Sequence, residues 1–127
     1  MSYDFAIWKR AESAKTAMLA EVYAAVCDDR SHLAMAPFDL PALESVLKAE
    51  FGDYSVDADL EILCYPGQTE SVCWMIVASP YSAAGDVHAR LVPIVLEHGL
   101  LLYDPQRKSV VGNKRPPCAS AATTRMP

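Results

Sequence analysis

The apolar run at residues 72–78, within the sequence ESVCWMIVAS, constrains the fold more than any other segment. Side chains alternate between the two faces of a strand, and here both faces are apolar. A strand of this kind is typical of a central position in a sheet. We therefore expect a β-sheet in which residues 70–79 form a central strand. One face carries Val72, Trp74, Ile76 and Ala78, and the other carries Cys73, Met75 and Val77.

The other apolar residues follow strand spacing in some segments and helical spacing in others. Residues 3–8 alternate as in a strand, whereas residues 11–27 and 40–51 carry apolar stripes at helical spacing. Asp39 is suited to cap the second of these helices, and Gly52 is suited to end it. The predicted elements are a strand at 3–8, helices at 11–27 and 40–51, paired strands at 60–65 and 70–79 with a turn at 66–69, a helix from Ser82 to His98, a strand at 100–103 and a short edge strand within 107–113.

This order of elements predicts an α+β protein with a single sheet. The succession β-α-α-β-β-α-β is typical of a ferredoxin-like arrangement with one extra helix and with the helices on one face of the sheet. Right-handed crossovers would place the first and last strands inside the sheet. We expect one α+β domain over residues 1–113. A disordered basic tail, rich in Pro, Ser, Ala and Thr, is expected at 114–127.

The net charge of −5 is unevenly distributed along the chain. Residues 1–104 hold six basic and 16 acidic residues, a net charge of −10, whereas residues 105–127 hold five basic residues and no acidic one. An acidic body repels nucleic acid and attracts basic protein surfaces, although charge also serves solubility. No apolar run approaches the roughly 20 residues of a membrane span, and the N-terminus does not resemble a signal peptide. We therefore expect a cytoplasmic protein that binds neither nucleic acid nor membrane.

No sequence motif indicates an enzyme or a cofactor site. The chain has five glycines and lacks the phosphate-binding and nucleophile-elbow motifs. Its cysteines form no C-x-x-C pair, and His88 and His98 would lie about 15 Å apart along one helix, so we expect no disulfide and no metal site. A Cys–His nucleophile, formed by Cys27 with His32 or by Cys73 with a helix histidine, is the alternative. Because no cysteine follows a glycine-rich turn into a helix N-terminus, where its thiol pKa would be lowered, we expect neither enzymatic activity nor a cofactor.

Two groups of acidic residues are the candidate binding residues. Four acids and no base fall within residues 53–61, and two more acids adjoin at 28–29. Paired carboxylates can bind calcium or do acid–base chemistry, but the first segment lacks the glycine and the closing glutamate of an EF-hand loop. It is either a solvated loop or a patch that docks a basic partner and speeds the encounter. The candidate partner-binding residues are Asp53, Asp57, Asp59, Glu61, Asp28 and Asp29.

Three stretches carry a resemblance to a known family, namely MSYDFAIW at the start, FDLPALESVLKAEF in the middle and EHGLLLYDPQ at 97–106. The chain resembles a family of small bacterial proteins over residues 1–106. Some members of that family are similar to immunity proteins encoded beside secreted or contact-dependent toxins. Pro93 departs from the family pattern, and it would kink or split the helix before the ending. The residues that match the ending are Glu97, His98, Gly99, Leu100, Tyr103, Asp104, Pro105 and Gln106.

The resemblance implies a cytoplasmic inhibitor that binds the C-terminal domain of a cognate toxin, with a nuclease as the expected class. An immunity protein needs a rigid scaffold and a complementary surface, and an acidic body suits the basic cleft of a nuclease. We therefore expect neutralisation of the toxin by covering its active site or a nearby surface. The alternative is a small-ligand-binding regulatory domain, a function that ferredoxin-like sheets often serve.

Overall fold

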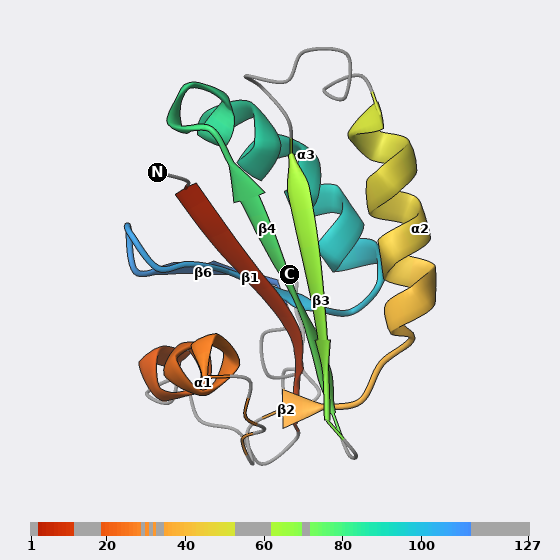
Figure 1. Cartoon of the computed structure of the whole chain (residues 1–127), viewed down its shortest axis with the longest axis vertical. Coiled ribbons are helices and arrows are strands. Elements are labelled where there is room, and N and C mark those ends of the chain that lie inside the picture. Colours follow the sequence, from red (N-terminus) through yellow and green to blue (C-terminus); the bar gives the residue numbers. More distant parts are fainter. Residues whose placement is uncertain are drawn as a thin grey trace, which may run out of the picture.

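The structure is a computed structural model, and it describes residues 3–11, 19–28, 30, 32, 35–52, 62–69 and 72–112. The described residues form an α+β fold of six strands, three α-helices and one short 3-10 helix (Figure 1). The expected tail at 114–127 and part of the helix expected at 11–27 lie outside these ranges. In chain order the elements are β1 (Tyr3–Arg10), α1 (Leu19–Cys27), β2 (Met35–Ala36), α2 (Leu40–Glu50), β3 (Leu63–Gln68), β4 (Cys73–Ser79), η4 (Tyr81–Ala83), α3 (Ala84–Glu97), β5 (Leu101–Asp104) and β6 (Ser109–Val111).

The strands form one sheet in the order β3-β4-β1-β5-β6, with β2 paired to the end of β1. Every pairing between these strands is antiparallel. The first strand therefore lies between β4 and β5, and the strand expected at 100–103 lies between β1 and β6. Both are internal, as predicted, and β6 confirms the edge strand expected within 107–113.

Each face of the sheet is covered by its own apolar core. Odd-numbered residues of β1, such as Phe5 and Ile7, join Met75 and the buried side chains of α2 and α3 in the larger core. Even-numbered residues such as Ala6 and Trp8 belong to the second core. We call the two faces the α2/α3 face and the α1 face, because the second core also contains Val22, Val26, Trp74, Leu101 and Tyr103.

The expectation that all helices cover one face is therefore wrong. Val22 and Val26 of α1 are buried against the face opposite to α2 and α3. Figure 1 shows α1 apart from the other two helices, which lie close to each other. The physical reason is that β1 and β4 carry apolar side chains on both faces. Burial of apolar surface stabilises a fold by about 25 cal/mol per Å², so a helix on the second face is favoured over leaving that face in water.

Helix α2 begins where its sequence predicts, but it ends at Glu50, one residue before the predicted end, with Phe51 as its C-cap. Gly52, expected to end the helix, does not adopt the left-handed conformation. The Asp39 carboxylate accepts a hydrogen bond of 3.1 Å from the Ala42 amide, and Pro41 follows in the first turn. The buried stripe of Leu40, Leu43 and Leu47 lies against the sheet.

Helix α3 differs from its sequence prediction at its start. Ser82 lies within η4 and does not cap the helix, whose N-cap is Ala83 and carries no side-chain hydrogen bond. Pro93 does not divide the helix, which runs continuously to Glu97 with the proline on its exposed side.

The end of α3 is fixed by a Schellman motif. Gly99 adopts a left-handed φ of 68°, a conformation that costs a glycine little. Its amide donates to the Leu96 carbonyl at 3.2 Å, and the Leu100 amide donates to the Val95 carbonyl at 2.8 Å. Val95 and Leu100 are both fully buried, which supplies the apolar contact that accompanies this motif. The chain therefore turns directly from α3 into β5.

The hairpin of β3 and β4 is shifted along the sequence relative to its prediction, with β3 at Leu63–Gln68 where 60–65 was expected and β4 beginning at Cys73. The turn expected at 66–69 is wrong, because β3 continues through Pro66 and Gly67 to Gln68. The connection follows at Thr69, whose amide donates to the Val72 carbonyl at 2.9 Å. An edge strand tolerates a proline, since its missing N–H need not serve a second neighbour.

Candidate functional site

The acidic residues predicted to bind a partner fall mostly beyond the described part of the chain. Asp53, Asp57, Asp59 and Glu61 lie outside the described residues, and so does Asp29. Asp28, in contrast, is described and is exposed just after α1. Its carboxylate forms an ion pair of 3.2 Å with Arg30, which is also exposed. The negative charge at the end of α1 is therefore partly balanced locally.

Both ends of the acidic segment 53–61 are attached to the larger core. Phe51, directly after α2, is buried within that core, and Ile62 packs against it from the other side of the segment. In the sequence, the four acids therefore fall between two residues that belong to this core or pack against it.

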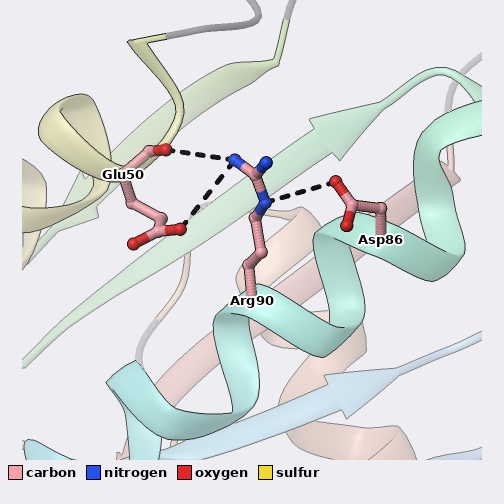
Figure 2. A network of polar contacts seen from close by, with 3 residues as sticks. All are labelled: Glu50, Asp86 and Arg90. Carbon is pink, nitrogen blue, oxygen red and sulfur yellow. Dashed lines mark hydrogen bonds and ion pairs between the residues drawn. The ribbon is translucent and has the colours of Figure 1, made fainter.

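Arg90 of α3 fixes the end of α2 that precedes this segment. Figure 2 shows its guanidinium between Glu50 and Asp86. Nη1 donates to the Glu50 carbonyl at 3.3 Å and lies 3.8 Å from the Glu50 carboxylate, while Nε lies 3.2 Å from the Asp86 carboxylate. A cation at a helix C-terminus also interacts favourably with the helix dipole. Arg90 therefore holds α3 to the end of α2 at Glu50, three residues before Asp53 in the sequence.

Immediately after the acidic segment, β3 presents apolar side chains to solvent. Leu63 is 40% exposed and Tyr65 is 52% exposed. Leu63 pairs with Ala78, and Tyr65 pairs with the half-buried Ile76, so all of these side chains lie on the α1 face. We call Leu63, Tyr65 and Ile76 the edge strip, because β3 ends the strand order of the sheet.

At the far end of β3, the same face is covered by Trp74. A Cβ atom at Gly67 would overlap the indole ring of Trp74, so the ring lies directly over the glycine backbone. Cys64 points to the other face and packs against the larger core. Cys64 on one face and the contact between Gly67 and Trp74 on the other thus hold the strand in place. Leu63 and Tyr65 remain exposed.

Sequence reasoning placed residues 60–65 in a strand but did not identify Leu63 and Tyr65 as surface residues. Leu63 and Tyr65 alternate with Ile62 and Cys64, which places the two pairs on opposite faces of the strand. This alternation is the signal in the sequence, since the pair on the less covered face would be exposed. Which face this is depends on the position of α1, and the sequence does not define that position.

A small hollow lies on the α2/α3 face, between the first half of α3 and the strands β1 and β5. It has a volume of about 90 Å³ and is lined by Tyr3, Phe5, His88, Asp104 and Arg107, among others. The Tyr3 hydroxyl donates to the Asp104 carboxylate at 2.7 Å, and burial together with this carboxylate raises the pKa of Tyr3. A hollow of this volume is too small for a metabolite.

Cys73, Cys64 and His98 are held within the fold. The Cys73 thiol donates to the Phe38 carbonyl at 3.3 Å, and burial raises the pKa of the Cys64 thiol, which disfavours the reactive thiolate. The His98 ring lies 2.9 Å from the Ile94 carbonyl at the end of α3. Nowhere in the described ranges do three His, Cys, Asp or Glu side chains converge on a position suited to a metal ion.

No protein-family model, no curated protein and no solved structure matches the chain. A separate observation concerns the helices themselves. Within the ranges that the structure describes, none of them combines the length and the apolar character that a membrane-spanning helix requires.

Proposed function

We propose that this chain is a bacterial immunity protein that acts in the cytoplasm. It binds a cognate toxin domain, of the nuclease class, and neutralises it by covering the active site or a nearby surface. The observation that carries the proposal is the segment 53–61, which places four acids and no base between α2 and β3 in a body of net charge −10. Binding of this kind requires a complementary surface and no catalytic group.

The charge distribution supports a basic protein as the partner. Nuclease active sites are rich in Lys and Arg because they bind phosphates. An acidic surface attracts such a cleft over a distance of about 10 Å at ordinary salt, and it raises the rate of association. The acidic body also repels nucleic acid, so we do not expect the toxin's own substrate to bind this protein.

The scaffold supports the same proposal. The order β3-β4-β1-β5 with antiparallel neighbours, together with the crossover helices α2 and α3, supports a ferredoxin-like assignment for this part of the sheet. In that assignment α1, β2 and β6 are additions. A sheet with a packed core on both faces presents its edge and loops rigidly, which lowers the entropic cost of binding.

The alternative function, a regulatory domain for a small ligand, has less support from the described residues. Ligand pockets usually have volumes of about 300–1,000 Å³. The hollow beside β5 has about 90 Å³, and a second hollow between α2 and β3 has about 250 Å³. Neither volume favours a metabolite-sized ligand.

The proposed function is tested by co-expression with the C-terminal domain encoded by the reading frame immediately upstream. We expect this domain to arrest growth, the chain to restore growth, and the two proteins to copurify as a stable complex. Substitution of Asp57, Asp59 and Glu61 by Lys should slow association at low salt by about tenfold or more, because the attraction during the encounter is reversed. Growth arrest that the chain does not relieve would contradict the proposed function.

A further inference from the structure

We propose that the edge strip is the surface on which the basic toxin domain docks, with Tyr65 as its principal contact. This inference rests on the proposed function, and it goes further by naming the surface and the way the partner binds.

The exposure of apolar side chains is the first argument. Four large apolar or aromatic side chains of the described residues are exposed by 40% or more. Tyr81 and Leu96 lie on η4 and α3, far apart in the sequence from β3, whereas Leu63 and Tyr65 lie two residues apart on one face of one strand. Tyrosine is also among the residues that contribute most to protein–protein binding, because it offers a large apolar surface with a polar end.

Charge identifies the kind of partner that this surface fits. Residues 62–69 carry no charge, and the four acids of 53–61 precede them directly in the sequence. An uncharged contact surface on a body of net charge −10 suits a basic partner that has an apolar pocket, since hot spots are apolar or aromatic and charge steers the encounter. A second copy of this chain is a poor occupant, since two bodies that each carry a net charge of −10 repel each other.

The edge strand also limits how the partner can bind. Pro66 has no N–H group, so an added strand would find the donor row of β3 interrupted. Side chains must therefore supply most of the contact. Leu63 and Tyr65 do so from a strand whose opposite face is held by Cys64 in the core, which keeps the contact surface rigid.

The test compares matched pairs of substitutions in the full chain. For each variant, Kd and the dissociation rate are measured by surface plasmon resonance on an immobilised, catalytically inactive form of the toxin domain encoded upstream. Tyr65→Ala is paired with Tyr81→Ala, which removes a tyrosine that is 48% exposed, and Leu63→Ala is paired with Leu96→Ala, which removes a leucine that is 53% exposed. We expect Tyr65→Ala to raise Kd by about 30-fold or more and Leu63→Ala by about fivefold. These increases should come mainly from faster dissociation, since the charges that steer association are unchanged. Tyr81→Ala and Leu96→Ala should change Kd by less than about twofold.

The outcomes separate this inference from the proposed function. If the wild-type chain binds the toxin domain and Tyr65→Ala binds equally well, the edge strip is not the docking surface, while the immunity function stands. If Tyr81→Ala weakens binding more than Tyr65→Ala, the interface lies at the other side of the sheet and the inference is overturned. If the wild-type chain neither binds nor protects, both fall together. Thermal unfolding of each variant identifies loss of fold, and in that case crosslinking from a photoreactive phenylalanine at position 65, compared with position 81, gives the same decision.

Discussion

The hydroxyl of Tyr3 donates a 2.7 Å hydrogen bond to the buried carboxylate of Asp104 and thereby joins the start of β1 to the end of β5. Only 3% of Asp104 is exposed. Its second oxygen accepts from the backbone amides of Gln106 at 3.0 Å and Arg107 at 3.2 Å, which closes the turn that contains Pro105. The ending YDPQ therefore serves the fold. Asp104 holds the start of β1 through Tyr3, and it is the last residue of β5.

Loss of this bond should lower stability. We expect Tyr3→Phe to reduce the free energy of unfolding by about 1.5–3 kcal/mol, because a buried carboxylate loses one of its donors. Tyr81→Phe is the matched control, since the Tyr81 hydroxyl accepts from the exposed Gln106 side chain, and its loss should cost less than about 0.5 kcal/mol. Urea unfolding measures both. Equal losses in the two variants would show that the Asp104 carboxylate does not depend on Tyr3.

The contact between Gly67 and Trp74 leads to a second prediction. Gly67→Ala should destabilise the protein by about 1–3 kcal/mol, because the added methyl group overlaps a rigid ring that is itself buried. Gly85→Ala is the control, since it adds the same methyl group to an open position in the first turn of α3 and should be neutral or stabilising by up to about 1 kcal/mol. Thermal unfolding with tryptophan fluorescence follows both variants. An unchanged melting temperature and emission spectrum for Gly67→Ala would contradict this packing.

The pKa of Tyr23 predicts how stability changes at alkaline pH. Burial, followed by the hydrogen bond with Cys27, raises the pKa of Tyr23 above its ordinary value of 10.0. The unfolded state therefore loses this proton first, and stability that is fully present below about pH 10 falls as the pH rises further. Tyr23→Phe should flatten that decline relative to the wild type in urea unfolding measured from pH 8 to about pH 11. The same alkaline decline in both proteins would exclude Tyr23 as its source.

The cluster around Arg90 predicts a fourth effect. Arg90→Gln should lower the free energy of unfolding by about 0.5–1.5 kcal/mol, because it breaks contacts to the end of α2 and to Asp86 (Figure 2). Lys48→Gln removes a longer and more exposed pair, 3.9 Å from Glu44, and should cost less than about 0.5 kcal/mol. Chemical unfolding at low and high salt measures both. If Arg90→Gln lowers the free energy of unfolding no more than Lys48→Gln does, Arg90 does not contribute to holding α2 against α3.

Some elements of this fold could be predicted from the sequence because their signals are local. Asp39 and the leucine stripe define α2, and Gly99 ends α3. The face on which α1 lies could not be predicted, because an amphipathic stripe shows that a helix is buried without showing against which surface. The end of β3 was misplaced because Pro66 and Gly67 are turn residues in most sequences, whereas an edge strand under a tryptophan ring tolerates both.

The candidate site was predicted only in outline. Charge counting identified the acidic segment 53–61, whose residues lie outside the described part of the chain. The edge strip depends on strand pairing and on the exposure of Leu63 and Tyr65, and these quantities arise from the packed fold.

The most direct test of the central claim is calorimetric titration of the purified full chain with an inactive variant of the C-terminal domain encoded by the reading frame immediately upstream, which the proposed function takes to be the toxin, together with an assay of the active domain. We predict an equimolar complex with a Kd in the nanomolar range, weaker binding as salt increases, and loss of toxin activity at equimolar chain. Absence of binding at micromolar concentrations, with undiminished toxin activity in excess chain, would contradict the account.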